Sequence, residues 1–335
     1  MTVRKIAPVL LCSFFVLFHT PAWGAVKHKK TAPRRGTGPA VLWRNPADIQ
    51  SRDLFYGPGG KEHMPHGPFT FVKEDLEGTN PKYVVRDADG HKWKAKIGIE
   101  ARPETVASRI VWAVGYFTAD EYLIPSLQVR DMPAHLHRGG KLIGPNGELT
   151  NVRLKREPAE EKLGEWEWRE EPFLGTRELN GLKVIMALIN NWDLKDENNA
   201  VYEENGEQVY MVSDLGASFG SAGRSWPRDR AKGNLRSYQQ SRFIRQVTET
   251  TVDFQVPARP RFVYLVDPKE YFSRLHLESI GRHVPKADVQ WMGRLLARLS
   301  PKQIRDAFRA GAYSPEETGQ FARVVERRIA ELTSL

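Results

Sequence analysis

The chain has 335 residues, of which 40% are hydrophobic and 27% are charged. This composition excludes wholesale disorder and predicts a protein with a sizeable core, built as one two-lobed domain or as two small domains. Lys and Arg total 50 against 41 Asp and Glu, and the net charge of +9 favours an anionic partner. No nucleic-acid-binding motif accompanies this charge, so we expect no nucleic-acid partner.

The first 24 residues have the pattern of a secretory signal peptide. Arg4 and Lys5 precede a short apolar run over 6–18, and small residues follow at Gly24 and Ala25. The run is short for a membrane span. We therefore expect cleavage after Gly24, or after Ala25, and export of a bacterial-type protein that becomes periplasmic or secreted.

The start of the mature chain is predicted to be a basic linker over residues 25–50. Its bases are Lys27, Lys29, Lys30, Arg34 and Arg35. A solvated tether is the default interpretation, and weak contact with an anionic surface is the alternative. Cys12 is the only cysteine, so cleavage would leave a chain without disulfides or thiol chemistry.

Three antiparallel strands are predicted after the linker. Their ranges are 69–72, 83–86 and 91–97, separated by a loop at 76–81 and a tight turn at 87–90. The third strand alternates strictly between apolar and basic residues. One face carries Trp93, Ala95 and Ile97, and the other carries Lys92, Lys94 and Lys96.

The rest of the chain is predicted to be more helical. In order we expect a helix at 103–116, strands at 122–124 and 127–130, a hairpin near 146–147, an apolar helix at 179–189, strands at 200–202 and 208–212, and mainly helices from 268 onward. This order indicates an α+β protein. An antiparallel β-rich first lobe with one helix would span 51–130, and a mainly helical second lobe with an irregular insertion would span 131–335.

Polar residues stand at the ends of four of these elements. Lys96 ends the third strand, and Glu104 lies in the first turn of the next helix. Asp193-Leu-Lys195-Asp-Glu-Asn198 follows the apolar helix, and Asp214-Leu-Gly216 follows a short strand.

This ordered set resembles the protein-kinase-like superfamily. The catalytic loop of that superfamily has Asp, then Lys two residues later and Asn five residues later, as Asp193, Lys195 and Asn198 do. Its metal motif Asp-Phe-Gly is similar to Asp214-Leu-Gly216, 21 residues after Asp193. The resemblance implies a two-lobed kinase-like fold and phosphate transfer from a nucleoside triphosphate to a hydroxyl acceptor.

The resemblance also implies a role for each residue of the catalytic loop and metal motif. Asp193 would accept the proton of the acceptor hydroxyl, and Lys195 would steady the phosphate during transfer. Asn198 and Asp214 would hold Mg²⁺ or Mn²⁺, which prefer oxygen ligands. Asn199 replaces Asn198 if the register slips by one residue.

Two further roles fall on the strand and the helix that follows it. Lys96 would hold the α- and β-phosphates of ATP or another nucleoside triphosphate, and Glu104 would hold Lys96 in place. Lys94, on the same face of the strand, is the alternative for the lysine. Glu100 is the alternative for the carboxylate.

Several departures from ordinary protein kinases indicate an atypical branch. Gly78 and Thr79 belong to the loop expected to cover the phosphates, and Gly78 lies 18 residues before Lys96, but the loop has one glycine. Asn191-Trp192 replaces His-Arg, and no Ala-Pro-Glu follows the metal motif. Lipid kinases, secretory-pathway kinases and bacterial toxin-module kinases show comparable reductions.

Three functions therefore stand open for this sequence. The first is an exported atypical kinase that acts on a protein, lipid or small-molecule hydroxyl. The second is a nucleotide-binding pseudokinase, or a nucleotidyl transferase, on the same fold. The third is a non-enzymatic envelope protein that binds polyanions through its basic linker and an Arg-rich segment after Gly220.

Overall fold

A computed structural model gives the fold of the chain over most of its length. It describes residues 36, 38–78, 80–157, 160–169, 172–191, 193–221, 232–255 and 277–335, all within one contiguous unit, Pro33–Leu335. The expected signal peptide, the first part of the expected linker and most of the Arg-rich segment lie outside the described residues. Among the described helices, none combines the length and apolar composition needed to cross a membrane.

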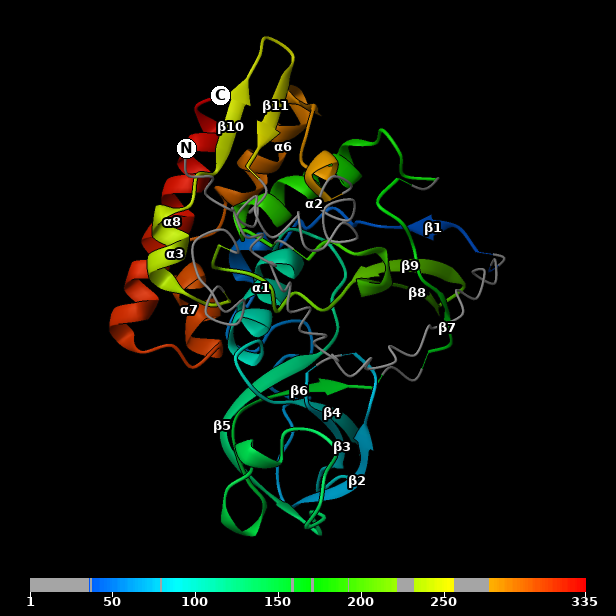
Figure 1. The fold of residues 1–335 in the computed structure, drawn as a ribbon. Coiled ribbons are helices and arrows are strands. Elements are labelled where there is room, and N and C mark those ends of the chain that lie inside the picture. The colour runs from blue at the N-terminus through cyan, green and yellow to red at the C-terminus, as the bar shows by residue number, and fades with distance from the viewer. Residues whose placement is uncertain are drawn as a thin grey trace, which may run out of the picture. The chain divides into compact units, whose positions relative to one another are not determined.

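A closed barrel of strands forms one region of the molecule, with strand order β2-β3-β4-β6-β5 (Figure 1). The strands are β2 (Phe69–Asp75), β3 (Lys82–Arg86), β4 (Lys92–Lys96), β5 (Glu121–Arg130) and β6 (Glu148–Arg156). Neighbouring strands are antiparallel, except that β2 closes the barrel by a short parallel pairing with β5. The alternation predicted for 91–97 is confirmed, because Trp93, Ala95 and Ile97 fill the barrel core.

The barrel extends past the lobe boundary expected at residue 130. Strand β6 lies between β4 and β5 and completes the barrel, so the first region runs to about Arg156. The two strands expected between 122 and 130 are one continuous strand, β5. The expected turn at Asn146 is present, with φ of 58° at Asn146 and a bridge between Ile143 and Leu149. Two short 3-10 helices, η2 (Gly140–Leu142) and η3 (Pro145–Gly147), lie before β6.

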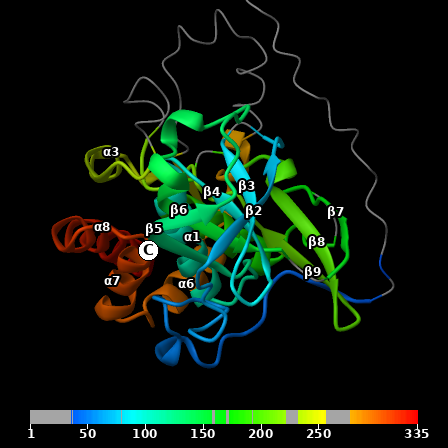
Figure 2. The ribbon, with the colours of Figure 1, turned by 90° about the horizontal axis from the view of Figure 1, so that it is seen from below.

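Helix α1 (Ala101–Ala113) packs against β5, β6 and helix α7 (Pro301–Ala310). It begins two residues before its predicted start, and Pro103 lies in its first turn as expected. Val106 and Ile110 of α1 belong to the large core shared with the helical region. In Figure 2, which looks from below, α7 and α8 (Pro315–Thr333) lie on one side of the view and the strands β7 (Lys162–Gly164), β8 (Asn199–Glu204) and β9 (Glu207–Val212) lie on the other.

The helical region contains the apolar helix predicted near 179–189 and the predicted C-terminal helices. The elements are α2 (Arg177–Leu188), α3 (Leu235–Gln240), α6 (Lys286–Leu296), α7 (Pro301–Ala310) and α8 (Pro315–Thr333). Capping boxes at Ser300 and Ser314 satisfy the first backbone N–H groups of α7 and α8. A hairpin of β10 (Ile244–Val247) and β11 (Thr251–Phe254), with β12 (Val284–Pro285), was not expected.

A second sheet, in the order β1-β9-β8-β7, leads directly into Asp214-Leu-Gly216, the metal motif predicted from the resemblance. Its strands are β1 (Ala40–Val41), β7 (Lys162–Gly164), β8 (Asn199–Glu204) and β9 (Glu207–Val212). β1 pairs with β9 in parallel, and Leu42 and Ile49 are buried. The end of the expected linker is therefore structured, because its apolar residues pack into the core. The overall α+β class is confirmed.

Candidate functional site

Lys96 lies at the centre of a buried cluster of ion pairs. Its Nζ atom is 2.8 Å from Glu104 Oε2, 2.7 Å from Glu100 Oε2 and 2.6 Å from Asp214 Oδ1. An ammonium group has three protons, so Lys96 can donate one to each carboxylate. The contact with Asp214 joins residues 118 positions apart in the chain, which brings the strand lysine and the metal motif together.

The charges of this cluster hold one another in the ionised state. Burial alone would lower the pKa of Lys96, but the carboxylates of Glu104, Asp214 and Glu100 raise that pKa above its usual range. Burial alone would raise the pKa of Asp214, but Lys96 holds it well below its usual range. The Asp214 side chain is nevertheless 47% exposed, so its carboxylate is accessible to a ligand.

Glu104 is positioned by a second base that the sequence analysis did not single out. Arg153 Nη2 is 3.3 Å from Glu104 Oε1, and Arg153 Nη1 is 3.0 Å from Glu121 Oε2. Glu121 in turn accepts a hydrogen bond from Ser108 Oγ at 2.6 Å. Glu104 therefore holds Lys96 with one oxygen and is itself held by the other. Only the pairing of β6 with β4 places Arg153 opposite Lys96.

Glu100, the alternative carboxylate, also contacts Lys96. It immediately precedes α1, pairs with Lys232 Nζ and accepts a hydrogen bond from Asn80 Nδ2. Gly216 lies so close that a Cβ atom there would be 2.7 Å from Glu100 Cβ. The glycine of the metal motif is therefore required by close packing against Glu100, and both carboxylates considered from sequence belong to the cluster.

Lys94, the alternative lysine, does not join the cluster. Its Nζ lies 3.9 Å from Asp75 Oδ2, and its side chain is 39% exposed. Among the described residues, the lysine that bridges α1 and the metal motif is therefore Lys96.

Asp214 adopts an uncommon backbone conformation. Its φ is 53°, in the left-handed region, where Asp is tolerated better than most residues other than glycine. Strain of this kind is concentrated at functional sites because surrounding contacts must hold it in place. The ion pair with Lys96 is one such contact.

The predicted catalytic loop is tied to the metal motif by the β8–β9 hairpin. The N–H and Oγ of Ser213, next to Asp214, both donate to the carbonyl oxygen of Asn198, at 3.0 and 2.8 Å. Asn198 Nδ2 donates to the carbonyl oxygen of Asp193 at 2.8 Å. Lys195 Nζ lies 3.5 Å from Asp193 Oδ1. A chain of contacts thus runs from Asp193 to Asp214.

The register of the asparagine pair is resolved by burial. Asn199 is 3% exposed, and its Nδ2 donates to the carbonyl oxygen of Trp166 at 3.1 Å. Asn198 is more accessible, and within the part of the chain that the structure describes its side chain forms a hydrogen bond only through Nδ2. Its Oδ1 atom therefore remains available to a ligand, whereas the Asn199 amide has a structural role.

The loop between β2 and β3 reaches the same cluster. Gly78 has φ of 64°, and its carbonyl oxygen accepts a hydrogen bond from Arg138. Thr79 lies outside the described residues. Asn80 contacts Glu100, so the end of this loop lies beside the Lys96 cluster.

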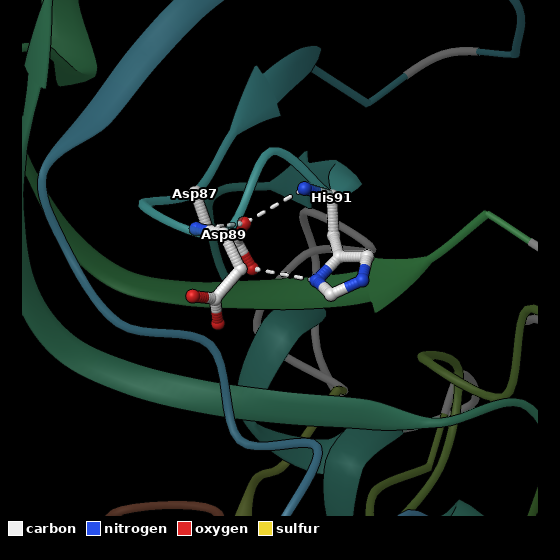
Figure 3. A group of neighbouring side chains, drawn as sticks. All are labelled: Asp87, Asp89 and His91. Carbon is white, nitrogen blue, oxygen red and sulfur yellow. Dashed lines mark hydrogen bonds and ion pairs between the residues drawn. The ribbon is translucent and has the colours of Figure 1, made fainter.

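Two groups of carboxylate or imidazole ligand atoms lie within 4.8 Å of one another among the described residues. The first comprises Glu100, Glu104 and Asp214, and the second comprises Asp87, Asp89 and His91. The second closes the tight turn predicted at 87–90 (Figure 3): Asp87 Oδ1 accepts from the backbone N–H of Asp89 and His91. Asp87 Oδ2 accepts from Trp93 Nε1 at 2.7 Å. Its contacts therefore account for Asp87 as a turn residue.

The comparisons with known proteins do not identify a family for this chain. No protein-family model matches the chain, and no curated protein sequence matches it. Among solved structures, it is similar to the crystal structure of a Helicobacter pylori proinflammatory kinase, CtkA. The TM-score is 0.43 at 12% sequence identity, over 79% of this chain and 96% of that chain. A likeness at this score establishes neither a family nor a fold, so the functional interpretation depends on the residues described above.

Proposed function

We propose that the chain is an atypical kinase that transfers the terminal phosphoryl group of a nucleoside triphosphate to a hydroxyl acceptor. The observation that carries this proposal is the position of Lys96, whose Nζ contacts Glu104 of α1 and Asp214 after β9. Backbone and side-chain contacts extend this cluster to Asn198 and Asp193. Phosphoryl transfer requires this combination of a phosphate-binding base, a metal-binding carboxylate and a carboxylate near the acceptor.

The proposed fold is two-lobed. The barrel and α1 would form the first lobe, and the helices with the β1-β9-β8-β7 sheet would form the second. Lys96 belongs to the first lobe and Asp214 to the second, so their ion pair would lie where the lobes meet. Export through the signal peptide expected at 1–24 belongs to the same proposal.

The residues present fit a divalent cation. Asp214 offers an accessible carboxylate, and Asn198 offers a side-chain oxygen whose amide nitrogen is already engaged. Oxygen donors of this kind suit Mg²⁺ and Mn²⁺. Bound there, the ion would neutralise charge on the phosphates.

The chain's own residues would carry the remaining steps. Lys96 would donate to the α- and β-phosphates while Glu104 and Arg153 keep it in position. Asp193 would take the proton of the acceptor hydroxyl while the hydroxyl oxygen forms a bond to the γ-phosphorus. The bond from that phosphorus to the bridging oxygen would break, and the nucleoside diphosphate would leave. Lys195, beside Asp193, would steady the phosphoryl group in transfer.

The test is phosphate transfer by the purified protein with labelled ATP and Mn²⁺ or Mg²⁺, to itself or to a cell extract. Asp193→Asn should lower transfer from the γ-position by about 10²- to 10⁴-fold, the usual contribution of a general base. Asp214→Asn should abolish it. Glu197→Gln is the matched control, because Glu197 is an exposed carboxylate of the same loop, 3.7 Å from Lys195.

Each alternative function gives a different result. Transfer of label from the α-position but not the γ-position indicates a nucleotidyl transferase. A rise in melting temperature with ATP and Mn²⁺, lost in Asp214→Asn but without transfer, indicates a pseudokinase. Salt-sensitive retention on an anionic resin with no nucleotide effect indicates a polyanion-binding protein. Each of these three results contradicts the proposed kinase activity.

A further inference from the structure

Glu100 is the carboxylate of the Lys96 cluster to which the proposed function gives no task. Glu104 fixes the position of Lys96, and Asp214 is the proposed metal ligand. Glu100 nevertheless places its Oε2 atom 2.7 Å from Lys96 Nζ and is 5% exposed. A third buried carboxylate on the same ammonium group therefore requires an explanation of its own.

The three carboxylates leave the Lys96 ammonium group no room for a further acceptor. Their oxygen atoms lie 2.6, 2.7 and 2.8 Å from Nζ, and an ammonium group has only three protons. The Lys96 side chain is also 3% exposed. A phosphate oxygen can therefore bind Lys96 only after one of the three carboxylates has moved away.

Glu100 is the carboxylate whose departure costs least. Glu104 is held from its other side by Arg153, and both side chains are buried. Asp214 forms a hydrogen bond of 2.6 Å with Lys96. Glu100 instead has a second cation, because its Oε1 atom pairs with Lys232 Nζ. If Oε2 leaves Lys96, Glu100 therefore does not become an unpaired buried charge.

Lys232 can receive Glu100 because its own backbone is fixed. The N–H of the next residue, Gly233, donates to the carbonyl oxygen of Ser218 at 2.9 Å. Gly233 has φ of 57°, and a Cβ atom there would lie 2.6 Å from the Tyr313 hydroxyl. Burial alone would raise the pKa of Glu100, but Lys96 and Lys232 hold that pKa below its usual range. Glu100 is therefore an ionised carboxylate between two lysines.

The Oε2 atom of Glu100 has the partners expected of a phosphate oxygen. Besides lying against Lys96, it accepts a hydrogen bond from Asn80 Nδ2. Asn80 belongs to the β2–β3 loop, which is expected to cover the phosphates. Carboxylate and phosphate oxygens both accept charge-assisted hydrogen bonds from such donors. Displacing this one oxygen would free a donor on the strand and another on the loop.

We propose that Glu100 occupies a phosphate subsite when no nucleotide is bound, and that a phosphate of the nucleoside triphosphate displaces it and takes Asn80 as a further ligand. The inference rests on the proposed function, because it concerns the same nucleotide. Glu100 Oε2 leaves Lys96 and Asn80, while Oε1 stays with Lys232, and no covalent bond changes. Glu100 thereby lowers the affinity for nucleotide, since only molecules in which it has moved can bind the phosphates at Lys96.

Calorimetric titration with adenylyl imidodiphosphate, an ATP analogue that resists transfer of its terminal phosphoryl group, tests the proposal in the presence of Mn²⁺. Glu100→Gln keeps the shape of the side chain but weakens its hold on Lys96, so the analogue should bind about tenfold more tightly than to the wild-type protein. If Glu100 only supported the structure, its loss would leave binding equal or weaker. Glu77→Gln is the matched control, because it removes an exposed carboxylate from the β2–β3 loop. It should leave the affinity unchanged.

A second variant separates the two parts that Asn80 can play. In the Glu100→Gln background, Asn80→Ala removes a phosphate ligand and should weaken binding of the analogue about tenfold, the loss of one hydrogen bond to a charged group. If Asn80 served only to hold Glu100, the added substitution would change nothing.

The outcomes distinguish this inference from the proposed function. The inference is wrong if the wild-type protein binds the analogue and Glu100→Gln binds it no more tightly, or if Glu77→Gln raises the affinity equally. It is also wrong if Asn80→Ala has no effect in the Glu100→Gln background. In all three cases the kinase proposal stands on its own transfer assay. If neither the wild-type protein nor Glu100→Gln binds the analogue, both proposals fail.

Discussion

The lysines at the two ends of one barrel face differ in how closely carboxylates approach them. At one end, Lys96 is 3% exposed and has carboxylates at 2.6, 2.7 and 2.8 Å. At the other end, Lys94 and Lys155 lie opposite each other on neighbouring strands, and the carboxylates near them are more distant. Asp75 Oδ2 is 3.9 Å from Lys94 Nζ, and Glu121 and Glu104 act on Lys155 without forming an ion pair with it among the described residues. The first end is held by short ion pairs, and the second only by weaker attraction over longer distances.

The difference has an energetic consequence. A buried ion pair contributes little net stability, but removing one partner strands the other charge and costs about 3–5 kcal/mol. A lysine without a partner carries the reverse sign, because its removal relieves repulsion and desolvation. Substitutions of the same chemical kind should therefore act in opposite directions at the two ends.

The largest effect is expected for Lys96→Met. It leaves Glu100 and Glu104 buried without their common base, so the free energy of unfolding should fall by about 3–5 kcal/mol. Urea unfolding followed by tryptophan fluorescence measures this change. In the double variant Lys96→Met/Glu100→Gln, which removes one stranded charge, part of the loss should be recovered. A fall of less than about 1 kcal/mol in Lys96→Met would contradict the cluster described here.

Gly216→Ala should have the next largest effect. The new Cβ would meet Glu100 Cβ at 2.7 Å, and overpacking of this kind costs about 1–3 kcal/mol of unfolding free energy. The matched control is Gly140→Ala, because a Cβ at Gly140 has no atom within 4 Å. Equal stability of the two variants in urea unfolding would show that Glu100 does not pack against the metal motif.

Lys155→Met should show the opposite sign from Lys96→Met. At pH 7 the unfolding free energy should stay the same or rise by about 1 kcal/mol, because an apolar side chain replaces a half-buried charge near Arg153 and Lys94. The same urea experiment measures it. A loss of several kcal/mol would mean that Lys155 has a carboxylate partner after all.

The smallest effect is a difference in pH dependence between the wild-type protein and Lys155→Met. Lys155 has a pKa of about 8 in the folded state, below its ordinary value of 10.5, and its neighbours are Arg153, Glu121, Glu104 and Lys94. Between these pH values the unfolded chain binds more protons, so wild-type stability should rise with pH relative to the variant. Below pH 8 the difference should be constant. Parallel curves from pH 7 to 10 would refute the depressed pKa.

The sequence predicted the cluster around Lys96 better than the arrangement of Lys94 and Lys155. Lys96, Glu104 and Asp214 stand at the ends of elements and follow an ordered pattern, so their convergence could be anticipated from a resemblance. The alternation in 91–97 also predicted which residues fill the barrel. It did not predict, however, that α1 and Asp214 would cover the side that carries Lys96. Strand periodicity identifies faces but does not say what packs on them.

The position of Lys155 opposite Lys94 could not be predicted from the sequence. Lys155 meets Lys94 only because β6 pairs with β4, across a connection that includes the irregular residues 131–147. The register between distant strands depends on the packing of the whole barrel, and no local sequence pattern predicts it. For the same reason, the position of Arg153 opposite Lys96 could not be predicted. The choice between Asn198 and Asn199 as the candidate ligand likewise depended on burial, because the two residues are neighbours in the sequence and have the same side chain.

The parallel pairing of β1 with β9 has a practical consequence for shortening the protein. β9 runs directly into Ser213 and Asp214, and β1 covers its outer edge through Ala40 and Val41. A chain trimmed to begin at residue 51 would leave the backbone N–H and C=O groups of that edge open to pairing with another molecule. Trimming should therefore stop before residue 38, because a shorter chain is expected to aggregate on expression.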